Sequence, residues 1–569
     1  MSGGTSNAPA PGPVRKKRVF PMTSPKEKIV IGARVITMER DAATDWQGLL
    51  IRSERIVRLI RRDELAALDD GTREIIDLGA RTLMPGFVDV HAHAEVVCRT
   101  AFKTVDCRAP ECDTIPAVLE KLRTDAPEGG PNDWIVGQAN LFFDRKLKEG
   151  RLPTRAELDT VSTQRPIALR AGGHITVLNS RALEVAGIDR HFVPPTQSIT
   201  GPVTVERDGN GDPTGIVKEM DVLLPLPSPN AEELSAAIED GLRHYFTRFG
   251  VTTIGEISET LDGLSAMNEL AMAGRLPVSM RIYLWVPGTM TLETVPHWRE
   301  RLALSAPESA MRIQGVKMFS DGGFSARSAA VNCCYKDSGN FQGHIAFPKY
   351  FLRRALRICR DNGLQLAIHA NGDRAQDWLS DMIAEMGGAG GGRERVRIEH
   401  AGNLMPQQAT ADKWAAAGIV PVPQPVFIYT FGEYFPDYLG EYGARGRFPF
   451  RSLLEAGWRL SGSSDVWIGS EREATNPFFS IWCCLKRETY SGNYIDPEEA
   501  ITLEQALRMH TIDAAWVMGE DDQKGSLAPG KLADIIALDA DPFETDIDQL
   551  RSIKVEFVMA RGETQLSVG

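Results

Sequence analysis

The sequence predicts an α/β fold: a (β/α)8 TIM-like barrel with an insertion after strand 1 and a small β-sandwich domain built from both chain ends. Three observations predict it. Short β-branched runs alternate with amphipathic stretches through the middle of the chain, as in parallel β/α units. Eight such runs can be counted, which is the number that closes a barrel. Both chain ends contain further short strand-like runs separated by turn residues.

The chain ends predict the small β domain. A tail at 1–28 is rich in Pro, Gly and Ser, lacks the apolar core of a signal peptide and is expected to be disordered. The N-terminal part of the β domain is expected at 29–85 and its C-terminal part at 511–569. The expected strands of this domain are 29–38, 48–60, 534–538 and 554–559.

The barrel is expected over 86–510. Its expected strands are 86–90, 251–257, 278–286, 313–319, 364–368, 396–399, 418–422 and 459–464. The gap between the first two is far longer than one connecting helix requires, so an inserted subdomain is expected at about 94–235. The glycine-rich stretch 387–392 lacks the Lys-Ser/Thr of a phosphate-binding loop and is expected on the opposite face of the barrel.

Composition narrows the class of protein. The 569 residues are 43 % hydrophobic and 25 % charged, which excludes a disordered or fibrous chain. A net charge of −12 disfavours nucleic acid as a partner, and no apolar run is long enough to predict a membrane span. Eight cysteines without a CxxC pair favour reduced thiols over disulfides or a zinc ribbon. We therefore expect a cytoplasmic protein acting on a small molecule.

The strongest local motif ends the first barrel strand. His91 and His93 are two residues apart, so their side chains face the same way on an extended backbone. At the carboxyl end of a barrel strand they would point into the face where such folds do chemistry. Two neutral imidazoles could hold one metal ion there, and the alternative is a chance pair.

Four more polar residues share this placement, namely Lys317, His369, His400 and Asp465. Taken singly, each has an ordinary explanation: a core or capped histidine, an aspartate at a helix N-terminus, or a lysine paired with a buried carboxylate. Together with the first motif they fall at the ends of five expected strands, which independent accidents would not produce. A buried lysine such as Lys317 also has a lowered pKa, and its neutral amine can add carbon dioxide to form a carbamate.

Six sequence motifs follow one another along the chain in an order that is typical of a known family. They are PGFVDVHAH (85–93), GVKMFSDGG (315–323), AIHANGDRA (367–375), RIEHAGNL (397–404), SGSSD (461–465) and GSLAPGKLADIIALDADP (525–542). With them the chain resembles the amidohydrolase superfamily, specifically the third amidohydrolase family, which includes N-substituted formamide deformylases. The resemblance covers nearly the whole chain after the tail.

The resemblance implies a binuclear metal centre, with one or two divalent ions per chain and zinc as the expected metal. By analogy His91, His93 and Asp465 would hold the buried ion, and His369 and His400 the more exposed one. A carboxylated Lys317 would bridge the two. Asp465 would also take a proton from the attacking hydroxide and pass it to the leaving nitrogen. A homo-oligomer, a dimer, is common in the family.

Substrate contacts are expected from loops that rim the same face. The candidate substrate-binding residues are His174, Asp321, Arg327, Tyr335, Phe427 and Trp467. Lys218 lies in the expected insertion and ranks below Lys317 as the bridging lysine, while Glu219 could contact substrate. The aromatics around Phe427 and Trp467 could form a pocket for a bulky N-substituent, or else a packed lid or subunit interface.

The expected function is a metal-dependent amidohydrolase that cleaves a non-peptide C–N bond, in an N-substituted amide or formamide, by attack of metal-activated hydroxide on the carbonyl. The alternatives are a hydrolase of a cyclic amide, lactone or carbamate on the same centre, and a mononuclear deaminase, which Lys317 disfavours. A non-catalytic interaction protein on the same barrel is disfavoured because all six ligand positions are filled.

Overall fold

The computed structural model describes residues 27–40, 45–68, 71–196, 203–324 and 326–568. Residues 1–26 of the tail expected at 1–28 lie outside the described residues. Glu27 and Lys28 already belong to strand β1 (Glu27–Ile31), so the predicted tail is too long at its end. The reason is pairing: the Glu27 carboxylate accepts from Arg52, and the Lys28 ammonium donates to the carbonyl of Gly562.

The centre of the molecule is a curled, seven-stranded parallel sheet whose strands follow one another in chain order. Its strands are β7 (Phe87–Ala92), β14 (Val251–Ser258), β15 (Ser279–Trp285), β16 (Met311–Phe319), β17 (Gln365–His369), β18 (Val396–Glu399) and β19 (Ile419–Val422). Each pairs in parallel with the next. Seven of the eight expected barrel strands are thereby confirmed, with ends that differ by at most two residues.

The prediction of an eighth strand at 459–464 is wrong, because this segment forms no ladder of backbone pairs with a neighbouring strand. Side-chain oxygens take the places of backbone partners. The Ser464 N–H donates to the carboxylate of Asp89 at 3.0 Å, and the Ser463 hydroxyl donates to the carbonyl of Pro423 at 3.0 Å. Serine side chains compete with strand ladders in this way. The segment nevertheless lies between β7 and the residue that follows β19.

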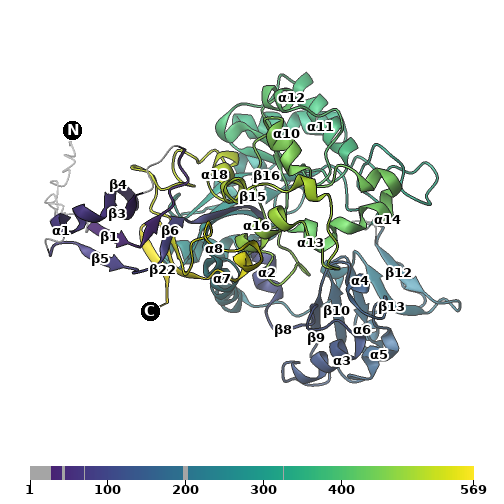
Figure 1. The fold of residues 1–569 in the computed structure, drawn as a ribbon. Helices are drawn as coiled ribbons and strands as arrows, with labels where there is room; N and C mark the ends of the chain where they lie inside the picture. The colour runs from purple at the N-terminus through teal and green to yellow at the C-terminus, as the bar shows by residue number, and fades with distance from the viewer. Residues whose placement is uncertain (1–26, 41–44, 69–70, 197–202, 325, 569) are drawn as a thin grey trace, which may run out of the picture.

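Helices connect and cover these strands (Figure 1). They are α7 (Ala231–Tyr245), α8 (Leu261–Met272), α9 (Trp298–Leu302), α10 (Lys349–Asp361), α11 (Asp373–Glu385), α12 (Ala411–Ala416), α13 (Phe427–Phe431), α14 (Phe435–Leu439), α15 (Phe450–Glu455), α16 (Pro477–Lys486), α17 (Leu503–Met509) and α18 (Ile512–Val517). Helix α7 begins where Asn230 and Glu233 cap each other reciprocally. Helix α10 buries Leu352, Ala355, Leu356 and Cys359, one face at helical spacing.

The chain between β7 and β14 contains its own six-stranded sheet, seen as a lobe at the lower right of Figure 1. Its strands, in spatial order, are β12 (Thr204–Arg207), β13 (Pro213–Lys218), β11 (Ile175–Leu178), β10 (Ile167–Ala171), β9 (Ile135–Ala139) and β8 (Thr104–Asp106). The helices of this lobe are α3 (Ile115–Thr124), α4 (Phe143–Lys146), α5 (Arg155–Asp159) and α6 (Ser180–Val185). Helix α2 (Ala94–Thr100) packs against α7 and the main core instead. Hydrophobic clusters on both faces of the sheet give this region its own core.

The described N- and C-terminal strands come together at the left of Figure 1. One sheet has the order β4 (Arg55–Arg61), β3 (Trp46–Arg52), β1 and β5 (Glu74–Asp77) beside the short helix α1 (Leu65–Leu68). The other has the order β2 (Arg34–Val35), β6 (Thr82–Pro85), β20 (Ile535–Leu538), β21 (Val555–Ala560) and β22 (Glu563–Ser567). Antiparallel pairing of β6 with β20 joins the N- and C-terminal segments. Residues of both sheets share one hydrophobic cluster.

Two further observations concern the whole chain. All eight cysteines are free thiols, as the sequence predicted. Within the described residues, no helix combines the length and the apolar character that a membrane span requires.

Candidate metal centre

The six predicted ligand residues come together at the carboxyl ends of the parallel strands. His91 lies within β7, Lys317 lies near the end of β16, and His369 ends β17. His400 directly follows β18, and Asp465 follows the extended segment 459–464. Because parallel strands end at one edge of a sheet, side chains far apart in sequence meet there.

Three of these residues form a compact group of potential metal ligands. One oxygen of Asp465, Oδ1, lies 3.2 Å from Nε2 of His91 and 3.4 Å from Nε2 of His93. One ligand atom from each of the three lies within 4.8 Å of the others. Two imidazoles and a carboxylate are the donor set of many sites for zinc and related divalent ions.

The far sides of both imidazoles face carboxylates. Nδ1 of His91 lies 2.6 Å from Oε2 of Glu399, and Nδ1 of His93 lies 2.8 Å from Oε1 of Glu259. A carboxylate at Nδ1 favours the tautomer with the proton on Nδ1 and leaves Nε2 free as a ligand. The donor atoms and their supporting groups therefore fit a bound divalent metal.

The pKa values of His91 and His93 shift in opposite directions. Burial and, after it, the charge of the nearby Lys317 lower the pKa of His91 to about 3, so this imidazole is neutral. Burial disfavours a charged His93, but hydrogen bonds to Asp465 and Glu259 outweigh it and raise the pKa of His93 to about 9. A metal ion that binds Nε2 of His93 would therefore displace a proton from it. Burial would raise the pKa of Asp465, yet the surrounding histidines hold it well below its ordinary value, so Asp465 is an anion.

Lys317 belongs to the cluster, and its side chain is fully buried. Its Nζ lies 3.1 Å from Nε2 of His91 and 5.1 Å from the centre of the Phe319 ring. Burial lowers the pKa of Lys317 to about 8, and the carboxylates of Glu399 and Asp465 oppose this shift. A neutral amine is therefore accessible near neutral pH.

His369 and His400 form the other side of the cluster. Nε2 of His400 lies 3.0 Å from Nδ1 of His369, and Nδ1 of His400 lies 2.8 Å from the side-chain oxygen of Gln424. His400 Nδ1 also lies 3.9 Å from the second oxygen of Asp465, Oδ2, which links this pair to the first group. Burial lowers the pKa of both histidines, so both are neutral and able to act as ligands.

Two of the six predicted substrate-binding residues, Trp467 and Phe427, border this cluster, and a third, His174, lies against Trp467. The Trp467 ring lies 6.2 Å from the ring of His93 and 5.2 Å from the ring of His174, centre to centre. On the other side, the Phe427 ring stacks on His400 at 6.5 Å with an interplanar angle of 11°. These aromatic faces give the centre an apolar border on two sides.

The other three take part in loop structure. The buried carboxylate of Asp321 accepts three backbone N–H groups from the loops after β16 and β17, and it lies 3.6 Å from Nε2 of His369. The Tyr335 hydroxyl donates to a neighbouring backbone carbonyl at 2.9 Å, and Arg327 donates to another at 3.1 Å. A substrate contact by Tyr335 or Arg327 stays a prediction.

Sequence reasoning missed the groups that support the ligands. Glu259 directly follows β14, the same strand-end placement that identified His369 and His400, and this signal could have found it. Glu399 could have been found from the two charged residues, Arg397 and Glu399, that alternate with apolar residues in β18. Gln424 carried no signal that separates it from an ordinary loop glutamine.

Aromatic rings continue from the cluster toward the six-stranded region. The Phe427 ring lies 4.6 Å from Phe431, whose ring lies 5.5 Å from Phe142. Phe142 adjoins α4, so the aromatic wall joins the loop after β19 to the region between β7 and β14. Lys218, ranked below Lys317 as a bridging lysine, is exposed at the end of β13.

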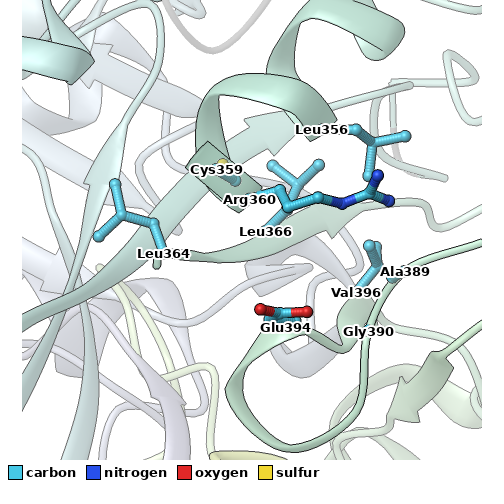
Figure 2. A pocket seen from close by; sticks show the side chains of 9 residues that line it. All are labelled: Leu356, Cys359, Arg360, Leu364, Leu366, Ala389, Gly390, Glu394 and Val396. Carbon is cyan, nitrogen blue, oxygen red and sulfur yellow. The ribbon is translucent and has the colours of Figure 1, made fainter. Parts of the chain in front are cut away.

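A separate crevice lies at the opposite end of the parallel strands (Figure 2). It is lined by residues of α10, by the first residues of β17 and β18, and by the glycine-rich loop, and its volume is about 10 Å³. This is room for about one water molecule. The glycine-rich stretch therefore lies on the face away from the metal centre, as predicted.

Comparisons with known proteins agree with this geometry. The model of the third amidohydrolase family, described as "Amidohydrolase family", matches residues 74–565. The N-substituted formamide deformylase of Arthrobacter pascens is 28 % identical over 94 % of this chain and 97 % of its own length. Crystal structures of uncharacterized metal-dependent hydrolases from Pyrococcus horikoshii OT3 and Pyrococcus furiosus superimpose with TM-scores of 0.70 and 0.69.

The first of these structures is 22 % identical and covers 92 % of this chain and 99 % of its own, and the second is 25 % identical and covers 91 % and 100 %. The family model spans most of the chain, from β5 through β22, and includes all six clustered residues. The chain therefore belongs to the third amidohydrolase family, a family of hydrolases that act on carbon–nitrogen bonds.

Proposed function

We propose that this protein is a metal-dependent hydrolase of N-substituted amides or formamides. The observation that carries the proposal is the group of His91, His93 and Asp465, whose ligand atoms converge while carboxylates support the far side of both imidazoles. The relative from Arthrobacter pascens, a deformylase of N-substituted formamides that matches nearly end to end, supports the choice of substrate class.

In this proposal His91, His93 and Asp465 would hold one divalent ion, with zinc as the expected metal. His369 and His400 would hold a second, and a carboxylated Lys317 would supply an anionic ligand to both. Two divalent ions would supply Lewis acidity toward the substrate carbonyl and lower the pKa of water toward about 7. The fully buried Lys317 supports the bridging role, because its Nζ lies 3.1 Å from Nε2 of His91 and its charge acts on His369 and His400 as well.

The proton transfers fall to Asp465. Its Oδ1 faces the two histidines of the first group, whereas its Oδ2 is directed toward the His400 side. Asp465 takes a proton from the attacking water as the oxygen adds to the carbonyl carbon. It then gives this proton to the nitrogen as the C–N bond breaks, which yields a carboxylic acid, formic acid for a formamide, and an amine.

The substituent on nitrogen would lie against the aromatic wall. Phe427 borders His400, and Phe431 and Phe142 extend the same apolar surface outward. Such a surface favours an aromatic or long aliphatic substituent over a small one, because it removes more apolar area from water. The aromatic contacts on this side are the support for that part of the proposal.

Replacement of a ligand tests the proposal. We expect His91→Ala to lower the metal content per chain, measured by elemental analysis, and to abolish hydrolysis of a panel of N-formyl and N-acyl amines. His510→Ala removes another buried histidine outside the cluster and should leave metal content unchanged. Full activity of metal-stripped protein, or of His91→Ala, would show that the proposed metal chemistry is wrong.

A further inference from the structure

A fully buried arginine lies directly behind the metal centre. Nε and Nη2 of Arg397 donate to the two carboxylate oxygens of Glu399 at 2.8 and 3.0 Å. Nη1 donates to the Tyr283 hydroxyl at 2.7 Å, and Nη2 also donates to the carbonyl of Val90 at 2.7 Å. The planar fork of the guanidinium therefore contacts three strands at once: β18, β15 and β7.

Two of these contacts lead to one ligand. The second oxygen of Glu399, Oε2, lies 2.6 Å from Nδ1 of His91. Val90 is the residue before His91, and its carbonyl is fixed by the same guanidinium. Arg397 thus acts on His91 twice, through the carboxylate that faces its ring and through the backbone that carries it.

The network continues away from the metal centre. The Tyr283 hydroxyl donates to the side-chain oxygen of Gln365 at 2.5 Å, and the Gln365 amide donates to the carbonyl of Val517 at 2.9 Å. These hydrogen bonds connect Glu399, the carboxylate next to His91, through Arg397 to the first residue of β17 and the last residue of α18. Every step is a direct contact between buried groups, so the position of His91 depends on a rigid path rather than on solvent.

We propose that Arg397 is a positioning residue for the metal centre: its bidentate hold on Glu399 and its bond to Val90 orient His91, and so set the affinity of the site for a divalent ion. The proposal rests on the proposed function only in that His91 binds metal, and it does not depend on which amide is cleaved.

Stability alone gives a weaker reason for this arrangement. Replacing a buried ion pair by well-packed apolar residues is often neutral or stabilising, so a core needs no such pair. A buried carboxylate behind a ligand imidazole does need a fixed partner, because it must be held in one place to favour one tautomer and one ring orientation. Lysine could supply the charge but not the fork that joins Glu399, Tyr283 and Val90.

The test compares two buried arginines. Arg281 is equally buried and bonds Glu520 at 2.9 and 3.0 Å, at the opposite end of the strands from the metal centre. We expect Arg397→Met to weaken zinc binding by about 10- to 100-fold in competition with a chromophoric chelator. Arg281→Met should destabilise the fold comparably and leave zinc affinity within about twofold.

A second variant also removes the negative charge of Glu399, which Arg397→Met leaves without its partner. In Arg397→Met with Glu399→Gln, the amide oxygen can still accept from Nδ1 of His91 without a buried, uncompensated anion. We expect this double variant to keep most of the loss of zinc affinity, because the fork that orients His91 is still absent. Recovery of most of the affinity would overturn the positioning role, because the unpaired charge alone would then explain the loss. If Arg397→Met does not fold, Arg397→Lys takes its place, since it keeps the charge and loses the fork, and a loss of affinity is again expected.

The outcomes separate the two proposals. If wild-type protein binds no divalent ion, the proposed function itself fails. If wild-type protein binds zinc and Arg397→Met or Arg397→Lys binds it equally well, the positioning role alone is overturned. An equal loss of zinc affinity in Arg281→Met would also overturn it, because the effect would then follow from general destabilisation.

Discussion

Replacing Lys317 with alanine separates its chemical role from its part in the core. The substitution removes three buried methylene groups, which at about 0.8 kcal/mol each amounts to about 2.4 kcal/mol of unfolding free energy. A protein of ordinary stability, about 5–15 kcal/mol, survives such a loss, so the variant should fold. Activity should fall by at least about 100-fold, the usual effect of removing one preorganised electrostatic contact to the reacting centre.

Two measurements then test the carbamate. In buffer with ¹³C-labelled bicarbonate, wild-type protein should show a carbamate carbon signal by NMR that Lys317→Ala lacks. Added propionate, which fits the vacated space and supplies two bridging oxygens, should restore part of the activity. Lys524 is also buried and lies 3.3 Å from Asp534 outside the cluster, so Lys524→Ala is the matched control and should retain the signal. Wild-type activity of Lys317→Ala without added acid would refute the bridging role.

Two further variants test other parts of the molecule. Phe427→Ala should raise KM for amides with an aromatic N-substituent by about tenfold, because one ring contact of about 1 kcal/mol and its buried area are lost. KM for small amides should change little. Equal changes in KM for the two classes of amide in steady-state assays would contradict the aromatic pocket. Burial lowers the pKa of His510 to about 3 from an ordinary value of 6.5, so the unfolded chain binds the extra proton between these values. Urea titrations should therefore show full stability above about pH 6.5 and a loss approaching 1.4 kcal/mol per pH unit below it, and His510→Gln should flatten this dependence relative to wild type.

The strands and most ligands could be predicted because both depend on local patterns. A short, mostly apolar run such as that ending at His369 predicts a buried strand, and a polar residue at its carboxyl end predicts a place on the catalytic face. Lys317 was identifiable because a charge inside an apolar strand is costly unless it has a partner. These inferences needed no knowledge of which strands are neighbours.

The supporting contacts could not be predicted because they depend on curvature and side-chain reach. Glu399 and His91 are adjacent only because the sheet curls and brings the end of β18 toward β7. The segment 459–464 failed as a strand because the carboxylate of Asp89, far away in the sequence, takes a backbone N–H that a neighbouring strand would otherwise bond. Pattern rules describe backbone periodicity and do not anticipate a side chain that substitutes for a strand.

The backbone at two of the proposed ligands supports a functional origin for these departures. Asp465 has a φ of 45° and His400 a φ of 73°, both in the left-handed region that non-glycine residues rarely occupy. Such a conformation costs on the order of 1–3 kcal/mol and persists only where other contacts fix it. Here the Asp465 N–H donates to the carbonyl of His91 at 2.8 Å, and the His400 N–H donates to the carbonyl of Val422 at 2.9 Å. Selection for stability alone would favour glycine at both positions, whereas only Asp and His present ligand atoms to a shared centre from these turns.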